Sequence, residues 1–391
     1  MGMRDRKVII VGAGIGGLTA ALALKARGAD VTVLEQADAI REVGAGLQIS
    51  PNGSVVLQAL GLGDALARAG LAARAVVLRD YRRSGDVVRL DLTRHAAEHP
   101  YLFVHRADLI DLLAQAAREV GVQLRLLQRV DRVSADPGPV LHTGSGARLR
   151  ADLVVGADGV HSRLRALLNG PEDPFFTGQV AWRATVPNRM NHPPEAQLYM
   201  GPKRHVVSYP LRGGDLVNIV AVQERAAWAA EGWHHADDPA NLRAAFADFA
   251  APVRGLLAGV EEVGLWGLFR HPVAQSWQGR GVALVGDAAH PTLPFLAQGA
   301  NMALEDAWVL ADALDGAASI EDGLEAYQAR RRARACKVIA AANGNAWKYH
   351  LRGPIRAPAH MAMRMAGRLA PERMVRQFDW LYAHDVTRNA G

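Results

Sequence analysis

The feature that most constrains this chain is a glycine pattern close to the N-terminus. Gly12, Gly14 and Gly17 stand between an apolar stretch and an alanine- and leucine-rich helical pattern, and Glu35 ends the next apolar stretch. In such a pattern the first glycine permits a tight turn, the second lets the backbone approach a pyrophosphate, and the third lets the helix pack on the strand. The carboxylate accepts hydrogen bonds from ribose hydroxyls. Residues 7–35 therefore predict a strand–helix–strand unit that binds a dinucleotide, and FAD and NAD are both open at this point.

Composition sets the class of protein. The chain has 391 residues, half of them hydrophobic, which is enough for one large domain or two ordinary ones. Cys336 is the single cysteine, so an internal disulfide is excluded and a reducing compartment fits. No apolar run reaches the roughly 20 residues that cross a bilayer, and the first strand begins too early to leave room for a signal peptide. We therefore expect a cytoplasmic globular protein without a bound metal.

The positive charge of the chain is unevenly distributed. The net charge is +6, and the excess is concentrated in ARRRARACK, residues 329–337, and among the arginines from Arg352 to Arg376. Nucleic-acid binders combine such charge with interleaved aromatic residues, so we expect no nucleic-acid partner. A solvated helix face is the favoured interpretation, and an amphipathic helix at a membrane surface is the alternative.

The order of the apolar patterns predicts an interrupted nucleotide-binding domain. Strand and helix patterns alternate in the first and last parts of the chain, whereas strands dominate residues 176–275. We predict an α/β fold in which a Rossmann-like domain carries an inserted, mainly antiparallel sheet domain and C-terminal helices. The predicted segments are 1–75, 100–175 and 276–340 for the nucleotide-binding domain, 76–99 and 176–275 for the inserted substrate domain, and 341–391 for the C-terminal helical segment.

Two further turns follow apolar strands and carry acids. Asp158 lies in DLVVGADGVHSRLR, where an ordinary helix cap is the alternative to a ligand contact. Asp287 ends a strand in VALVGDAAHPTLPFLAQGANMALEDA, and there its carboxylate is suited to hold a polyol hydroxyl. Gly299, Ala300 and Asn301 open the next helix, whose free N–H groups and dipole favour an anionic oxygen.

These three motifs, in this order, resemble those of the class A flavoprotein monooxygenases with the para-hydroxybenzoate hydroxylase fold, over nearly the whole chain. The resemblance implies FAD as the cofactor, with NADH or NADPH as a transient co-substrate. It implies that the first motif holds the ADP half, that Asp287 meets the ribitol, and that the helix start faces the flavin N1–C2=O edge. The motif of Asp158 would serve both FAD and NAD(P)H. The residues that match cofactor-binding positions are Gly12, Gly14, Gly17, Glu35, Arg41, Arg106, Asp158, Asp287, Gly299, Ala300 and Asn301.

The segment KRHVVSYP, residues 203–210, reads as a strand on which His205, Val207 and Tyr209 share one face. Sheet packing alone is one interpretation of this face. Elsewhere, GAGLQISPN and HPTLPFLAQGANMALEDA are similar to the family branch of salicylate hydroxylase, 3-hydroxybenzoate 6-hydroxylase and 6-hydroxynicotinate 3-monooxygenase, which has a His-x-x-x-Tyr pair on a substrate-domain strand.

The resemblance to this branch implies a reaction and two catalytic residues. Reduced FAD and O2 would give a C4a-hydroperoxide that transfers OH to an electron-rich ring. His205 would then be the base for the phenol, and Tyr209 a hydrogen-bond partner of the substrate. Four residues along a strand span about 13 Å, so the two side chains would flank a ligand.

Departures from the branch leave the substrate open. The hydroxynicotinate enzymes carry histidines where this chain has Gln48 and Phe295, and the 3-hydroxybenzoate enzyme has a glutamine in place of Pro294. A phenolic or related aromatic carboxylate is the expected substrate class. The alternatives are a quinone-ring hydroxylase at a membrane surface, a flavin halogenase and a non-catalytic flavin- or NAD-binding sensor. The halogenase signature Trp-x-Trp-x-Ile is absent, because Trp228 and Trp233 are too far apart.

The C-terminal region predicts a contact between copies of the chain. Its helical pattern from about residue 320 includes spaced apolar side chains, and we expect them to pack in a homodimer, with packing on the chain's own core as the alternative. These residues are Met361, Met365, Leu369, Met374 and Phe378.

Overall fold

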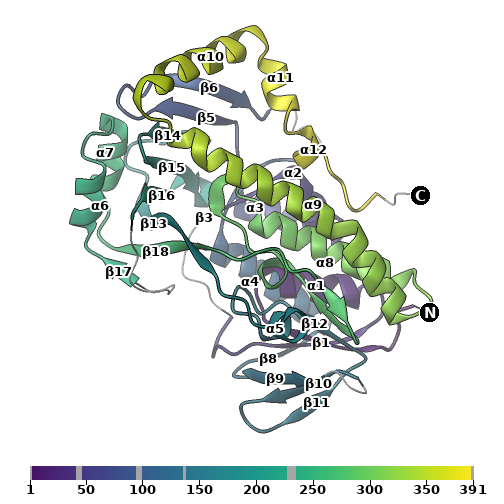
Figure 1. Cartoon of the computed structure of the whole chain (residues 1–391). Helices are drawn as coiled ribbons and strands as arrows, with labels where there is room; N and C mark the ends of the chain where they lie inside the picture. The colour runs from purple at the N-terminus through teal and green to yellow at the C-terminus, as the bar shows by residue number, and fades with distance from the viewer. Residues whose placement is uncertain (1, 41–45, 94–98, 135–137, 227–234, 389–391) are drawn as a thin grey trace.

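The computed structural model describes residues 2–40, 46–93, 99–134, 138–226 and 235–388 (Figure 1). Arg41, predicted to lie beside the flavin, falls outside the described residues.

A six-stranded sheet carries the N-terminal glycine turn. In spatial order its strands are β19 (Gln278–Gly279), β20 (Val282–Leu284), β12 (Leu153–Gly156), β1 (Lys7–Val11), β2 (Asp30–Leu34) and β8 (Gln123–Arg125). All pairs are parallel except β19 with β20. Parallel sheets are covered on both faces, which is why β12, with the sequence LVVG, is apolar and buried throughout.

Helices cover this sheet. They are α1 (Ile15–Lys25), α2 (Pro51–Ala59), α3 (Gly63–Ala69), α4 (Arg106–Glu119), α5 (Arg163–Asn169), α8 (Gly299–Asp315) and α9 (Ile320–Tyr349), with the short 3₁₀ turns η2 (Gly286–Ala288) and η3 (Pro294–Leu296) before α8. Helix α8 packs between α1, α2 and α9 (Figure 1). The helix that follows the first glycine turn and the helix that follows Asp287 therefore lie side by side.

An eight-stranded sheet forms the second layer. Its spatial order is β17 (His235–Asp237), β18 (Val263–Arg270), β13 (Phe175–Pro187), β16 (Leu216–Glu224), β15 (Arg204–Leu211), β14 (Glu195–Gly201), β5 (Ala75–Asp80) and β6 (Asp86–Asp91). Only β14 and β5 pair in parallel. Alternate residues such as Trp182, Val206 and Ile219 point to one face, where they form a core with side chains of α6 (Pro239–Ala245) and α7 (Ala251–Ala258). The opposite face is left for the site.

Two small antiparallel sheets complete the fold. One contains β3 (Gly46–Ile49), β7 (Leu102–His105) and β4 (Gly70–Ala72), and it brings Gln48 next to the large sheet. The other is an antiparallel meander with β9 (Val130–Ser134), β10 (Val140–Thr143) and β11 (Arg148–Arg150). A 3₁₀ turn, η1 (Arg212–Gly214), links β15 to β16.

The C-terminal helices close over the edge of the large sheet. They are α10 (Arg356–Leu369), α11 (Pro371–Arg376) and α12 (Asp379–Tyr382), preceded by η4 (Gly353–Ile355), and α10 and α11 both contact β6 (Figure 1). Helix α9 runs unbroken across residues 340–341, where the sequence predicts a domain boundary. The domain boundaries remain predictions. Of the helices in the described residues, none has the length and apolar character needed to cross a bilayer.

The five apolar C-terminal side chains predicted to pack between copies of the chain lie in two different environments. Met361, Met365 and Leu369 are exposed on α10. Met374 and Phe378, however, line the internal cavity. The reason is a break at Ala370, whose φ of −143° and ψ of 58° end the helix before Pro371 and turn the following residues inward.

Candidate functional site

A cavity of about 980 Å³ lies between the C-terminal ends of β1, β2 and β12 and the free face of the eight-stranded sheet. Residues that the sequence predicts to be cofactor-binding or catalytic, and that lie far apart along the chain, line this cavity together. On the side of the parallel sheet these are Gly12, Gly14, Glu35, Arg106, Asp158, Asp287, Gly299 and Ala300, and on the side of the large sheet His205 and Tyr209.

The first glycine turn has the geometry that its sequence predicts. Gly12 has a φ of +103°, and a Cβ there would lie 2.3 Å from the carbonyl oxygen of Ala157. A Cβ on Gly17 would lie 2.0 Å from the carbonyl oxygen of Gly12, so this glycine permits helix–strand packing. At Gly14, by contrast, no atom lies within 4 Å of the Cβ position. The protein itself does not need a glycine there, and the open space suits a ligand that touches the backbone.

Glu35 is held at the end of β2 by two backbone hydrogen bonds. Its Oε2 accepts from the N–H of Ala13 at 2.8 Å, and its Oε1 accepts from the N–H of Ala37 at 2.9 Å. Each carboxylate oxygen can accept a second hydrogen bond. The side chain lines the cavity and is thus fixed in place for hydroxyl donors of a ligand.

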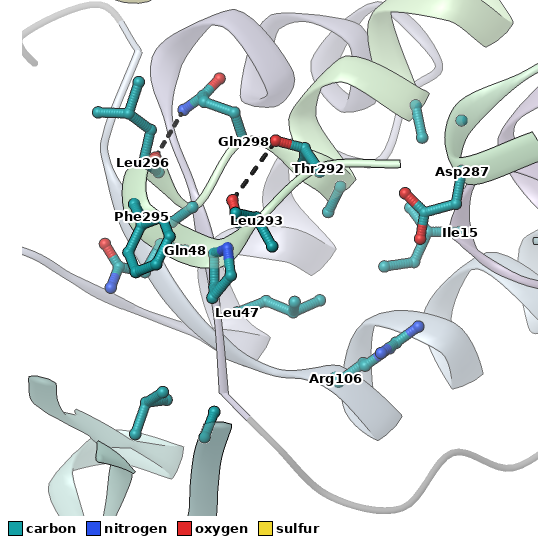
Figure 2. Close-up of a pocket in the computed structure, with 18 of the residues that line it drawn as sticks. Ile15, Leu47, Gln48, Arg106, Asp287, Thr292, Leu293, Phe295, Leu296 and Gln298 are labelled. Carbon is teal, nitrogen blue, oxygen red and sulfur yellow. Dashed lines mark hydrogen bonds between the residues drawn. The ribbon is translucent and has the colours of Figure 1, made fainter. Parts of the chain in front are cut away.

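Asp287 and Arg106 lie on the same side of the cavity, next to Ile15, in Figure 2. The Asp287 side chain is open to the cavity, but protein atoms surround that space. The resulting desolvation raises the pKa of Asp287, although His290 and Arg106 oppose the shift. Burial likewise lowers the pKa of Arg106, which begins α4. A polar ligand with hydroxyl groups is suited to this enclosed pair.

A buried ion network supports the turn that carries Asp287. Asp306 on α8 accepts from the N–H of Gly286 at 3.0 Å and from Nε of Arg331 at 2.7 Å, and it pairs with His290. From the other side, buried Arg165 on α5 donates to the carbonyl of Ala289 at 3.0 Å. The position of Asp287 is therefore set by two helices.

The three residues at the start of α8 take two different positions relative to the cavity. Gly299 and Ala300 line the cavity, as expected for a helix start that faces a ligand. The Asn301 side chain instead lies fully buried behind them. It accepts from the N–H of Ser50 at 3.0 Å and donates to the carbonyl of Gln48 at 2.9 Å. Its side chain thus fixes β3 and α2 to α8 and does not face the cavity.

Asp158 is both a local cap and a cavity residue. Its Oδ2 accepts from the N–H of Arg163 at 2.8 Å, while Ser162 caps α5. Its Oδ1 is buried and has no hydrogen-bond partner among the described residues. Desolvation raises the pKa of Asp158. A buried acceptor without a partner is costly, so this atom calls for a donor from a ligand.

The free face of the large sheet forms the opposite wall. His205, Val207 and Tyr209 of β15 line the cavity together, as the alternation of the strand predicts. His205 is only 2% exposed, and its ring lies 5.7 Å from Phe295 and 5.4 Å from Tyr349. Its Nδ1 lies 2.7 Å from Nε2 of His350. Desolvation lowers the pKa of His205 well below its usual value, so the ring is neutral near neutral pH.

Tyr209 belongs to a set of aromatic and amide groups. Its ring stacks on Phe103 with a centroid distance of 5.0 Å. Burial raises the pKa of Tyr209. Arg183 and a hydrogen bond with Gln48 lower this pKa, but the effect of burial is larger. Gln48 in turn accepts from the hydroxyl of Tyr101 at 2.6 Å. The Tyr209 phenol is therefore neutral and in reach of polar partners at this end of the cavity.

Arg183 is the functional candidate that the sequence did not reveal. It lies on β13, lines the cavity, and sits near Tyr209. In the part of the chain that the structure describes, no carboxylate affects its pKa, which burial lowers. Arg183 is half-buried, and a cation in such a place without a neighbouring anion favours an anionic ligand. In the sequence, QVAWRATVP reads as an ordinary strand, and only its pairing with β16 and β18 shows that Arg183 points into a cavity.

The residues on the parallel-sheet side of the cavity have the space and the polar groups needed to bind FAD. The open space at Gly14, the fixed carboxylate of Glu35 and the unsatisfied Oδ1 of Asp158 line one connected cavity with Asp287 and the start of α8. The loop around η3, with Leu293, Phe295 and Leu296, lines the same cavity and lies beside Gln48 in Figure 2. Among the described residues no group of acids, histidines or cysteines is arranged to hold a metal ion.

The chain is similar to known proteins in sequence and in structure. The protein family described as "FAD binding domain" matches residues 5–342. The chain is 37% identical over 361 residues to 3-amino-4-hydroxybenzoate 2-monooxygenase of Streptomyces cremeus, with 89% of each chain covered. It is 33% identical over 398 residues to 3-hydroxybenzoate 6-hydroxylase of Polaromonas naphthalenivorans, with 98% of this chain and 97% of the relative covered. The crystal structure of Klebsiella pneumoniae HpxO complexed with FAD and uric acid is similar, with a TM-score of 0.84, 27% identity and 95% of both chains covered.

Proposed function

Because this chain belongs to the FAD binding domain family of flavoprotein monooxygenases, we propose that it hydroxylates the ring of a phenolic or related aromatic carboxylate, using O2 and NADH or NADPH. The family, the fold class and FAD as the cofactor, all predicted from the sequence, are confirmed by these similarities. The substrate itself and the roles of individual residues are part of the proposal.

One observation carries this function. The residues that fit FAD and the three polar side chains of the large sheet, Arg183, His205 and Tyr209, line the same cavity. Bound FAD supplies the redox chemistry, namely reduction by the nicotinamide and activation of O2. The cavity thus provides one connected space in which a ring can meet the cofactor.

The protein groups of the large sheet would bind and activate the ring. Arg183 supplies a cation for the carboxylate, and Tyr209 a hydroxyl group for orientation. Apolar side chains such as Leu198, Val207 and Phe295 contact the ring faces and exclude water. His205 accepts the phenol proton, because an ionised phenol donates electrons to the ring far better than a neutral one.

The relatives narrow the substrate class. Two named relatives are hydroxylases of hydroxybenzoates, one of them amino-substituted. In this chain Gln48 lies between Tyr101 and Tyr209, and its amide offers both a donor and an acceptor. We therefore place hydroxybenzoates with a further polar substituent first among the candidates.

The test is a ligand screen on the purified protein. Hydroxybenzoates, aminohydroxybenzoates, salicylate and hydroxynicotinate would be titrated against the flavin absorbance, and NADH or NADPH oxidation and ring products would then be measured. We expect at least one phenolic acid to perturb the flavin, accelerate nicotinamide oxidation and yield a hydroxylated product. Binding of FAD without turnover across the panel would favour the sensor interpretation instead.

We also propose that the protein acts in the cytoplasm as a homodimer. Met361, Met365 and Leu369 are exposed, by 55%, 54% and 80%, at a spacing that places them on one side of α10. Packing of this stripe against a second copy would bury it. Light scattering of the full chain and of Met365→Lys tests this, and a monodisperse wild-type monomer would end the idea. Co-sedimentation of the wild type with liposomes would favour the membrane alternative.

A further inference from the structure

His205 is the inner end of a line of three titratable side chains that leads out of the cavity. Its Nδ1 lies 2.7 Å from Nε2 of His350, which follows the long helix α9 and does not line the cavity. The Nδ1 of His350 lies 2.8 Å from Oε1 of Glu224 at the end of β16. The side chain of His350 is 4% exposed, whereas that of Glu224 is 38% exposed. The line therefore begins at a buried ring and ends in solvent.

The carboxylate at the outer end determines the tautomers of both rings. An ionised carboxylate only accepts hydrogen bonds, so Nδ1 of His350 must carry a proton. With His350 neutral, its Nε2 is an acceptor, and Nδ1 of His205 must donate to it. Nε2 of His205 is then left with a free lone pair. Because Nδ1 is occupied, Nε2 is the nitrogen of His205 that is available to the cavity.

We propose that Glu224 and His350 are positioning residues that hold His205 as a base and carry the substrate's phenol proton to solvent. The proposal rests on the function proposed above, because it needs a phenol in the cavity. It adds two residues, 126 positions apart, that no motif marks.

The transfers balance along the line. The phenol O–H bond breaks as an N–H bond forms at Nε2 of His205. The proton on Nδ1 of His205 passes to Nε2 of His350, and the proton on Nδ1 of His350 passes to Glu224, which exchanges it with water. The net result is a phenolate in the cavity and a proton in solvent. When the hydroxylated ring regains a proton, the same steps run backwards and restore both tautomers.

The surroundings of the two rings favour transfer along the line. Phe295 from η3 and Tyr349 from α9 pack against His205, and burial raises the pKa of Tyr349, so this phenol remains neutral. Lys348 lines the same cavity. Burial lowers the pKa of His350 too, and Glu224 opposes that shift. Because the pKa values of both imidazoles are lowered, neither ring holds an extra proton stably. Glu224, by contrast, is exposed to solvent and can release the proton.

The first test reads the tautomers directly and needs no substrate. Nitrogen NMR of the holoenzyme with ¹⁵N-labelled histidine would be assigned with His205→Asn and His350→Gln. We expect both His205 and His350 to be neutral and protonated on Nδ1. In Glu224→Ala the His350 signal should shift toward the Nε2-protonated form. Protonation of either ring on Nε2 in the wild type would overturn the proposal.

The second test uses the best phenolic acid from the screen. Glu224→Gln keeps a hydrogen-bond acceptor but cannot take up the proton, and we expect kcat to fall about 10-fold or more with little change in KM. The loss should recover as the pH rises, because solvent base then removes the phenol proton. Asp248→Asn, which removes a partly exposed carboxylate that pairs with neighbouring Arg204, is the control and should match the wild type.

The two tests separate the proposals. If the wild type hydroxylates but Glu224→Gln shows an unchanged kcat and pH profile, the relay is wrong and the proposed function stands. If no phenolic acid is hydroxylated, the proposed function fails, and the tautomers seen by NMR still decide whether Glu224 sets the state of His205.

Discussion

The carboxylate of Asp306 accepts a hydrogen bond from the backbone N–H of Gly286 at 3.0 Å and so fixes to α8 the turn that carries Asp287. Burial opposes the charge of Asp306, but His290, Arg331 and the Gly286 N–H outweigh burial and lower its pKa to about 2. The turn that we propose to bind the cofactor thus depends on one ionised, fully buried side chain.

Acid should weaken this network in a defined pH range. The pKa of Asp306 is about 2 in the folded state, against a reference value of 3.8 for the unfolded chain. Its contribution to the free energy of unfolding is therefore present above about pH 4 and is lost as the pH falls toward 2. The difference corresponds to on the order of 2 kcal/mol. We expect Asp306→Asn to lower the thermal unfolding midpoint near neutral pH, and the gap to the wild type to shrink toward pH 2.

A matched control lies on the same helix. Asp312→Asn removes two partly exposed pairs, with Arg330 and with Arg27, and we expect a cost of about 0–1 kcal/mol. Buried histidines such as His192, whose pKa is lowered by burial, add a separate loss below their reference value of 6.5. That loss is common to all variants and cancels in the comparison. Equal effects of the two substitutions would contradict the role of Asp306.

The first glycine turn offers a pair of alanine substitutions with opposite consequences. Gly17→Ala places a Cβ 2.0 Å from a backbone oxygen and should destabilise the FAD-free protein by about 2 kcal/mol or more. Gly14→Ala meets no protein atom within 4 Å, so we expect FAD-free stability within about 0.5 kcal/mol of the wild type. Its FAD affinity should fall about 10-fold or more, because the methyl group occupies ligand space. Thermal unfolding and flavin fluorescence titration measure the two effects, and wild-type FAD affinity in Gly14→Ala would refute the assignment.

Local patterns explain what the sequence could predict. The roles of Gly12 and Gly17 follow from a strand and a helix joined by a few residues, and the shared face of His205 and Tyr209 follows from the two-residue period of a strand. The order of the motifs along the chain indicated the fold class and FAD. In these cases the prediction rests on a local pattern or on a known period, although the atom nearest to a Cβ on Gly12 belongs to Ala157, far along the chain.

The residues that were missed depend on distant packing. His350 meets His205 across 145 residues, and only the register of the large sheet directs Arg183 into the cavity. The sequence predicts Asn301 at a helix start, and its side chain faces away from the cavity because it bonds to Ser50, next to α2, and to Gln48 of β3. For Met374 and Phe378 a signal was present: Pro371 restricts the residue before it and breaks the helical spacing.

Arg183 should determine selectivity for a carboxylate. A hydrogen bond to a charged group contributes about 1.5–3 kcal/mol, so Arg183→Gln should weaken binding of the preferred aromatic acid by about 10- to 100-fold. The corresponding phenol without a carboxylate should bind wild type and variant equally, which makes the ligand pair its own control. Flavin absorbance titrations give both dissociation constants. Equal weakening for acid and phenol would indicate a structural role for Arg183 instead.

The role of His205 is best tested by the product formed per nicotinamide oxidised, compared between the wild type and His205→Asn. We expect both proteins to hold FAD, and we expect an aromatic acid to accelerate nicotinamide oxidation in the wild type with formation of a hydroxylated ring. In His205→Asn we expect ring product to fall by about 100-fold or more, with peroxide as the alternative product of oxygen. Hydroxylated product at the wild-type level in His205→Asn would contradict the assignment of His205 as the base in this cavity.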